Sequence, residues 1–276
     1  MKNINISNPQ FASPKNFAGM SAVISMLSGV LGLVLVMGAI PETPIERSPL
    51  GIFCCLVILF SAILIFVPKL MSWDWQSKYF GVPIFHVSMI SLLGIIPLLC
   101  VVFYGRISWV LSAIILISFV ILHYWWMRRF VLVYKRIFCD EGLVRLLYCE
   151  IDGGIYYMQK VDKYFIDNIF KFRQFPADRY LIVCVIVSFS MLFYVDAVTS
   201  ITGLPFAYSF LAMASLPVSL AFMGLATRGW LIFYYYPNKI YRRCGKRVYV
   251  DMVNIPIDFK KNIAVWKRSL KSSRLK

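Results

Sequence analysis

Long apolar runs, separated by short polar or basic segments, set the pattern of this chain. A helix that crosses a bilayer needs about 20 mostly apolar residues, because the hydrocarbon core is about 30 Å thick and each residue adds about 1.5 Å. Six stretches are long and apolar enough. They lie at about 17–40, 50–67, 82–104, 107–127, 180–199 and 208–227. The pattern therefore predicts six transmembrane helices.

The composition excludes an ordinary soluble globule. Apolar residues make up 60% of the chain and charged residues 15%, and the mean hydropathy is +0.72. Soluble domains carry about 45–50% apolar and about 25% charged residues, so this chain has too little charge to cover its own surface. The expected fold class is an all-α polytopic membrane protein.

The basic residues predict how the chain is threaded. All but two of the 29 Lys and Arg residues lie in the segments 1–16, 68–81, 128–179 and 228–276; the exceptions are Arg47 and Arg106. Because cytoplasmic loops are rich in Lys and Arg, we expect both termini on the cytoplasmic side of a bacterial inner membrane. The expected organisation follows directly. It comprises an N-terminal segment (1–16), helices one to four (17–127), a cytoplasmic loop domain (128–179), helices five and six (180–227) and a basic cytoplasmic region (228–276).

The net charge of +16 needs no nucleic-acid partner, since membrane insertion alone selects basic cytoplasmic loops. Anionic lipid headgroups are the partner that this charge predicts most directly. The seven cysteines form no C-x-x-C motif and no zinc-type spacing with histidine, so we expect no metal site and no cofactor.

The loop 128–179 contains a hairpin signal. Two β-prone runs, 144–151 and 154–159, flank Asp152-Gly153, a dipeptide that favours a two-residue type I′ turn. The run 161–172 follows, with apolar residues at helical spacing, and predicts a short amphipathic helix.

The C-terminal region repeats this order. The run 230–236 is β-prone or interfacial, 240–244 and 246–253 predict two short strands, and a helix is expected after Pro256. A duplication is one interpretation. The one we favour is that 128–179 and the C-terminal region fold together into a small α+β cytoplasmic cap.

The tail helix is the predicted contact surface. One face is apolar and the opposite face basic, which favours contact with anionic lipid or with a protein partner. The residues are Phe259, Ile263, Trp266 and Leu270 on the apolar face, and Lys260, Lys267, Arg268 and Lys271 on the basic face.

Ionisable residues are nearly absent from the predicted spans, which argues against an ion-coupled transporter. Asp196 is expected near the outer interface, in a structural ion pair with Arg106; coupling-ion binding is the alternative. His86 and His123 are predicted at similar depths on adjacent helices. They are either two accidental interfacial histidines or a pair that ligates haem or a metal.

Small residues recur on helix one, where Ser21, Ser25 and Gly29 are four apart and Gly32 lies nearby. This spacing lets a helix approach another backbone closely, either within the chain or in a homodimer. Pro97 and Pro217 interrupt two other predicted spans. They predict ordinary kinks whose freed carbonyls find neighbouring donors, or the paired broken helices of a transporter.

The sequence contains none of the common catalytic or nucleotide-binding motifs G-x-S-x-G, H-E-x-x-H, Walker loop and G-x-G-x-x-G. We therefore expect a non-enzymatic membrane protein that acts by protein interaction. It would be an accessory of a membrane assembly or secretion system, or an immunity protein against a membrane-active toxin. The alternatives are a carrier or channel for a small neutral or apolar solute and, less favoured, a lipid-headgroup-modifying enzyme.

Overall fold

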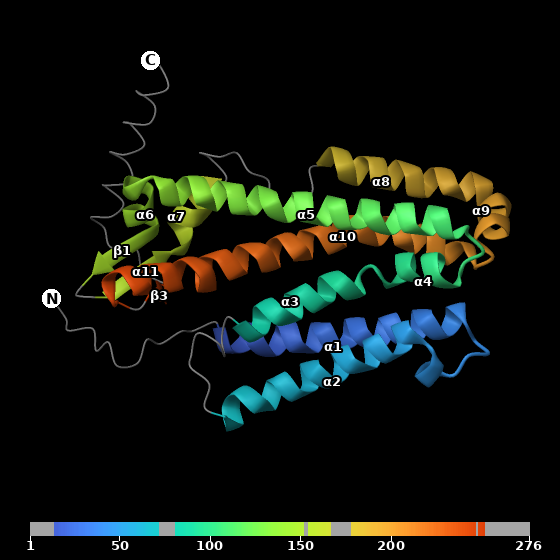
Figure 1. The fold of residues 1–276 in the computed structure, drawn as a ribbon, viewed down its shortest axis with the longest axis horizontal. Coiled ribbons are helices and arrows are strands. Elements are labelled where there is room, and N and C mark those ends of the chain that lie inside the picture. Colours follow the sequence, from blue (N-terminus) through green and yellow to red (C-terminus); the bar gives the residue numbers. More distant parts are fainter. Residues whose placement is uncertain (1–13, 72–80, 152–153, 167–177, 247, 252–276) are drawn as a thin grey trace, which may run out of the picture. The chain divides into compact units, whose positions relative to one another are not determined.

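The computed structural model describes residues 14–71, 81–151, 154–166, 178–246 and 248–251 (Figure 1). Contacts between Cα atoms divide the chain into two compact units. The first, called here the helical unit, contains residues 14–132 and 173–234. The second, called the sheet unit, contains residues 133–172 and 235–276, together with the first thirteen residues.

The helical unit consists of long apolar helices. Five of the described helices are long and apolar enough to cross a membrane, and the pair α3–α4, bent by 41°, makes a sixth span if counted as one. The chain is therefore a helical membrane protein, as predicted. The elements are α1 (Pro14–Ala39), a 3-10 turn (Ile45–Arg47), α2 (Pro49–Leu70), α3 (Val82–Leu93), α4 (Ile96–Tyr104), α5 (Trp109–Cys139), α8 (Asp178–Met191), a 3-10 turn (Leu192–Tyr194), α9 (Val195–Thr202) and α10 (Phe206–Trp230). The last turns of α5, from residue 133, belong to the sheet unit.

Local signals account for several helix ends. The Gly51 N–H donates to Ser48 Oγ at 3.1 Å, and Pro49 occupies the first turn of α2, where its missing N–H costs nothing. Gly203 ends α9 with φ +67°, a left-handed conformation that favours glycine. Gly203 lies in the turn between α9 and α10.

The core of the helical unit gathers where α1, α2 and the α3–α4 pair meet. Cys54, Ile96 and Cys100 are fully buried there, and Val36 is almost so. Tyr208 at the start of α10 donates to the Leu35 carbonyl at 2.7 Å, which ties α10 to α1. This close packing brings neighbouring backbones near enough for side-chain hydroxyls to bond across helices.

The sheet unit is built on three short strands, β1 (Tyr148–Ile151), β2 (Gly154–Met158) and β3 (Val248–Asp251). β1 and β2 pair antiparallel with Ile151 opposite Gly154, which confirms the predicted hairpin. The turn residues 152 and 153 lie outside the described residues. β2 also pairs with β3, in parallel. A strand from the C-terminal region therefore completes the sheet begun by the 128–179 loop.

Two predicted strands are wrong in part or whole. Residues 144–147 belong to the helix α6 (Glu141–Leu147). The reason is local: Asp140 Oδ1 accepts the N–H groups of Gly142 and Leu143 and caps the helix, which then buries Leu143 and Leu147. The strand begins only at Tyr148.

Residues 240–244 are also helical. They belong to α11 (Tyr236–Cys244), and the β-prone reading of 230–236 is wrong as well, because residues 231–235 form a π-helix. Pro237 falls in the first turn of α11, where a proline is tolerated. Gly245 then ends the helix with φ +70°. β3 confirms the predicted strand after it.

The helix predicted at 161–172 is present in part, as α7 (Gln159–Tyr164). Its remainder from residue 167 onward, and the predicted tail helix after Pro256, lie outside the described residues.

Candidate functional site

The helical unit encloses a set of buried serine and histidine side chains, called here the polar belt. None of these side chains is more than 7% exposed. A buried polar group in a bilayer must find a partner inside the protein, because no water is available to it. The members are Ser21 and Ser25 on α1, Ser61 on α2, His86 and Ser91 on α3, His123 on α5 and Ser219 on α10.

One part of the polar belt joins α1 to α2 and α3. The hydroxyls of Ser25 and Ser61 are 2.9 Å apart and hydrogen-bonded. Ser21 Oγ lies 3.5 Å from His86 Nδ1. His86 is fully buried, and its Nε2 makes no hydrogen bond within the described part of the chain.

The other part joins α3, α10 and α5. Ser219 Oγ donates to the Ser91 carbonyl at 2.8 Å, and Ser91 Oγ donates to the Ser219 carbonyl at 2.7 Å. His123 Nε2 lies 3.0 Å from Ser219 Oγ. Its other ring nitrogen, Nδ1, lies 3.1 Å from the Phe119 carbonyl. Ser219 is thus the point at which three helices meet.

The reciprocal serine pair lies at the break between α3 and α4. In a continuous helix the Ile95 N–H would donate to the Ser91 carbonyl, but here it donates to the Leu92 carbonyl at 3.2 Å. The Ser219 hydroxyl supplies the donor that Ser91 has lost. Pro97 begins α4 at its first turn, whereas α10 continues through the buried Pro217.

The two histidines have different hydroxyl partners, on α1 for His86 and on α10 for His123. Within the described part of the chain, no hydrogen-bond partner is common to both rings. Among the residues that the structure describes, no group of three or more His, Cys, Asp or Glu side chains could hold a metal ion. The arrangement around each histidine is that of a hydrogen-bonded side chain between helices.

Asp196 and Arg106 do not form the predicted ion pair in the described part of the chain. Asp196 is exposed in the first turn of α9, where a carboxylate is favourable near the N–H groups of the helix start. The Arg106 side chain lies against Gly203, and its backbone N–H donates to the Thr202 carbonyl at 2.7 Å. The two turns do meet, but through backbone contacts.

The small residues of α1 face other helices of the same chain. A Cβ at Gly29 would lie 2.6 Å from Ile58 Cγ1, and one at Gly32 would lie 3.1 Å from Cys54 Sγ. Close approach of α1 to α2 therefore depends on these glycines, while Ser21 and Ser25 add the hydrogen bonds described above. The homodimer alternative stays a prediction.

The sheet unit contains a buried carboxylate that the sequence reasoning missed. Asp162 is 0% exposed. Tyr134 Oη donates to its carboxylate at 2.9 and 3.1 Å, and Tyr157 Oη donates at 2.6 Å. The pKa of the neighbouring Tyr148 is raised well above its usual value, first by burial and then by the negative charge of Asp162. A signal was present, since Asp162 precedes Phe165 by three residues and so lies on the apolar face of the predicted helix.

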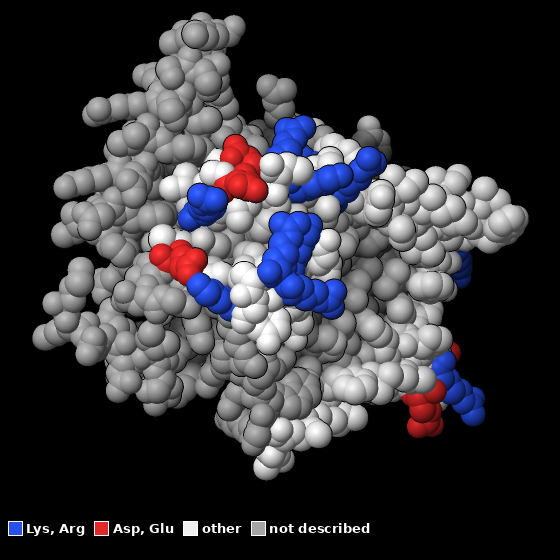
Figure 2. Space-filling model, turned by 60° about the vertical axis from the view of Figure 1, so that its left-hand side comes forward, with Lys and Arg blue, Asp and Glu red and all other residues white. Residues whose placement is uncertain are grey.

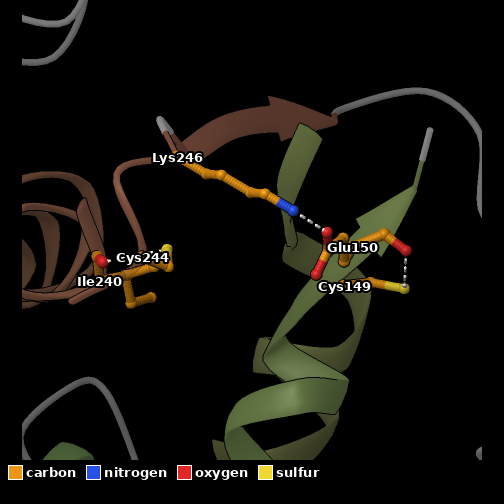
Figure 3. A network of polar contacts seen from close by, with 5 residues as sticks. All are labelled: Cys149, Glu150, Ile240, Cys244 and Lys246. Atoms are coloured by element: carbon orange, nitrogen blue, oxygen red, sulfur yellow. Dashed lines mark hydrogen bonds and ion pairs between the residues drawn. The ribbon is translucent and has the colours of Figure 1, made fainter. Parts of the chain in front are cut away.

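A surface ion pair also links distant segments of the sheet unit (Figure 3). Lys246, which follows α11, donates to the Glu150 carboxylate on β1. This hydrogen bond, followed by the charge of Glu150, raises the pKa of Lys246. Cys149 and Cys244 flank the pair, and the Cys244 thiol donates to the Ile240 carbonyl at 3.1 Å.

Exposed basic side chains outnumber acidic ones on the sheet unit, and Figure 2 shows Lys and Arg gathered on the face in view, with few carboxylates. On α11, Lys239, Arg242 and Arg243 are all exposed, and Tyr241 beside them is 48% exposed. We call these four residues the basic face of α11. The contact residues predicted on the tail, 259–271, lie outside the described residues.

No family model matches the chain, and no curated protein or solved structure is significantly similar to it.

Proposed function

We propose that the chain is a non-enzymatic, multi-pass protein of a bacterial inner membrane that acts by binding another protein through its sheet unit on the cytoplasmic side. The observation that supports this is the sheet unit itself. Two segments separated by about ninety residues of sequence are paired strand to strand, between Tyr156 on β2 and Tyr249 on β3. A loop that only connects spans needs no such organisation.

The surface of the sheet unit fits a binding role. The basic face of α11 combines three cations with a half-exposed tyrosine, and Arg and Tyr are residue types enriched at protein interfaces. Its charge also suits anionic lipid headgroups. An acidic protein surface, held close to the membrane by a protein anchored there, is the partner that we propose.

The helical unit would serve as the anchor. Several of its buried hydroxyls bond to one another and to backbone carbonyls, as in the Ser25–Ser61 and Ser91–Ser219 pairs. Side chains used in this way hold helices together. The accessory and immunity roles both fit such an architecture, and they differ in the partner: a resident membrane complex or an incoming toxin.

The test is purification of the full chain from its native membrane in mild detergent, with and without charge reversal on the basic face of α11. We expect one protein to co-purify in stoichiometric amount with the wild type and to be lost from Arg242→Glu/Arg243→Glu. The matched control is Arg47→Glu, which reverses an exposed charge in the helical unit and should keep the partner. Equal recovery with all three proteins would contradict the proposal.

A second candidate is a carrier or channel for a small neutral solute, favoured by one observation. The broken span α3–α4 meets the continuous helix α10 close to Pro217, at the Ser91–Ser219 pair, and interrupted helices line the binding sites of many transporters. Proteoliposomes containing the full chain, placed in hyperosmotic glycerol or urea, should then reswell faster than empty liposomes. Identical reswelling rates would remove this candidate and leave the first untouched.

A further inference from the structure

The hydrogen atoms around His123 can be counted. The Phe119 carbonyl can only accept, so His123 Nδ1, 3.1 Å away, must carry a hydrogen and donate it. The Ser91 carbonyl and the Ser219 carbonyl can likewise only accept, at 2.8 and 2.7 Å from the hydroxyls of Ser219 and Ser91. Each serine hydroxyl has one hydrogen to give.

A neutral His123 leaves this network one hydrogen short. With Nδ1 protonated, a neutral ring presents Nε2 as an acceptor, and the donor beside it is Ser219 Oγ at 3.0 Å. The single hydrogen of Ser219 then has two acceptors, His123 Nε2 and the Ser91 carbonyl. One of the two contacts must lose its hydrogen bond.

A doubly protonated His123 completes these four contacts at once, and leaves only the longer contact of 3.2 Å between the hydroxyl oxygens of Ser91 and Ser219 without a hydrogen of its own. Its Nε2–H donates to Ser219 Oγ, Ser219 donates to the Ser91 carbonyl, Ser91 donates to the Ser219 carbonyl, and Nδ1–H donates to Phe119. The ring of Phe119 also lies 3.9 Å from the imidazole ring, centroid to centroid. A cation is attracted to an aromatic face at this distance.

We propose that His123 is a proton-binding site within the helical unit, and that proton binding decides whether Ser219 holds the Ser91 carbonyl at the break between α3 and α4. Loss of the proton turns Nε2 into a competitor for the Ser219 hydrogen. The link between the broken span and α10 is then weakened at the point where the α3 backbone has lost its own donor. This inference goes beyond the proposed function and does not depend on it.

Few charged or titratable side chains lie near this site on the three helices that contribute to it. α3 carries no charged residue, and its only histidine is His86. On α10 the one charged residue is Arg228, nine residues beyond Ser219, and the one tyrosine is Tyr208, eleven residues before it. On α5 itself the nearest titratable residues are Tyr124, Arg128 and Arg129. Within these three described helices no carboxylate is present to stabilise the imidazolium, so carbonyl, hydroxyl and ring dipoles must do so.

The experiment is an NMR titration of the full chain in lipid nanodiscs, with ¹⁵N-labelled histidine and His86→Gln as the background, so that His123 gives the only histidine signals. We expect Nε2 to gain a proton with a single midpoint as the pH is lowered. A His123 ring that stays neutral throughout, in protein that remains folded, would overturn the proposal.

Two variants separate proton binding from a purely structural role. Ser219→Ala removes the acceptor of the Nε2–H and should lower the midpoint by about one to two pH units, as expected for a hydrogen bond to a charged group. Ser209→Ala removes a buried hydroxyl of the same helix that has no hydrogen bond in the described structure, and should leave the midpoint unchanged. Equal midpoints in the two variants would contradict the assignment.

The coupling to the helix break has its own readout. With serine labelled at the carbonyl carbon, the Ser91 signal, assigned by its disappearance in Ser91→Thr, should shift with the same midpoint as His123. A Ser91 signal that stays constant while His123 titrates would show that the proton does not control this hydrogen bond.

Discussion

The two units of this chain bury polar groups in opposite ways. The helical unit uses side chains that carry no permanent charge and bond in pairs between helices, such as Ser25 with Ser61. The sheet unit instead buries one carboxylate, Asp162, and surrounds it with tyrosine hydroxyls. The difference is the one expected if the helical unit lies in the bilayer and the sheet unit outside it: a charge within a bilayer is expensive, whereas a domain in water can fold around a charge whose lone pairs are satisfied.

The same contrast extends to the outer surfaces. Large apolar side chains such as Leu27, Ile121 and Phe189 are more than half exposed in the helical unit, as is expected of helices that face lipid. On the sheet unit exposed Lys and Arg take their place. The predictions below test whether the two units do occupy these two environments.

The largest expected effect is an all-or-none difference in thiol labelling. If the sheet unit is cytoplasmic, its exposed Cys139 and Cys244 should not react with an impermeant maleimide in intact cells, and should react once the cells are opened. A cysteine introduced at the exposed Thr43 should react in intact cells. Labelling of Cys244 from outside would contradict the predicted threading.

Removal of the buried carboxylate should be the most damaging single change to the sheet unit. Asp162→Ala leaves the hydroxyls of Tyr134 and Tyr157 without this acceptor, and we expect a loss of about 3 kcal/mol or more in the free energy of unfolding. Protease resistance of the sheet unit in the full chain measures the effect. The control is Glu150→Ala, which removes an exposed carboxylate of the same unit and should change protease resistance little. Equal protease sensitivity of the two variants would show that the buried Asp162 does not stabilise the sheet unit more than an exposed carboxylate does.

In the helical unit the matching change is a methyl group at the contact of α1 with α2. Gly29→Ala places a Cβ 2.6 Å from Ile58 Cγ1 and should cost about 1–3 kcal/mol through overpacking. Gly81→Ala is the control, since its Cβ would meet Tyr234 at an ordinary 3.6 Å. Thermal unfolding in detergent should separate the two variants, and similar melting temperatures would show that α1 and α2 are not packed this closely.

A smaller effect is expected for the hydrogen bond between Ser25 and Ser61. Hydrogen bonds between transmembrane helices contribute only about 0.6 kcal/mol on average. In a double-mutant cycle of Ser25→Ala and Ser61→Ala, we expect a coupling energy of that size. Strictly additive losses would mean that the two hydroxyls do not interact.

The smallest effect should come from the surface pair of Lys246 and Glu150. The pKa of Lys246 is raised in the folded chain above its ordinary value of 10.5, so the contribution of the pair is fully present below that pH and is lost as the pH rises through the raised value. Lys246→Met should therefore be slightly less stable than the wild type at pH 8, and the difference should disappear in strongly alkaline solution. A stability difference between Lys246→Met and the wild type that grows as the pH rises would contradict this contribution of the ion pair.

Much of the architecture follows from the sequence alone, because its signals are local. A run such as 17–40 is long and apolar enough to predict a spanning helix, whatever its neighbours are, and α1 is found there. Asp152-Gly153 between two β-prone runs predicts a hairpin in the same way, and β1 pairs with β2. The serine and glycine spacing on helix one likewise marked the face that contacts α2 and α3.

Other features were decided only by tertiary structure, since they depend on contacts between residues far apart in the chain. Residues 240–244 have β-prone spacing but continue a helix that Gly245 ends, and β3 finds its parallel partner across about ninety residues of sequence. Asp162 lies on the apolar face of the predicted helix, but only the folded chain shows that Tyr134 and Tyr157 surround it. Ser219 becomes the meeting point of three helices only because the break after α3 leaves the Ser91 carbonyl without its own donor. Each of these features depends on a partner residue that is distant in the sequence and that no local pattern predicts. The contacts of the polar belt and of the buried carboxylate could therefore be identified only in the folded chain.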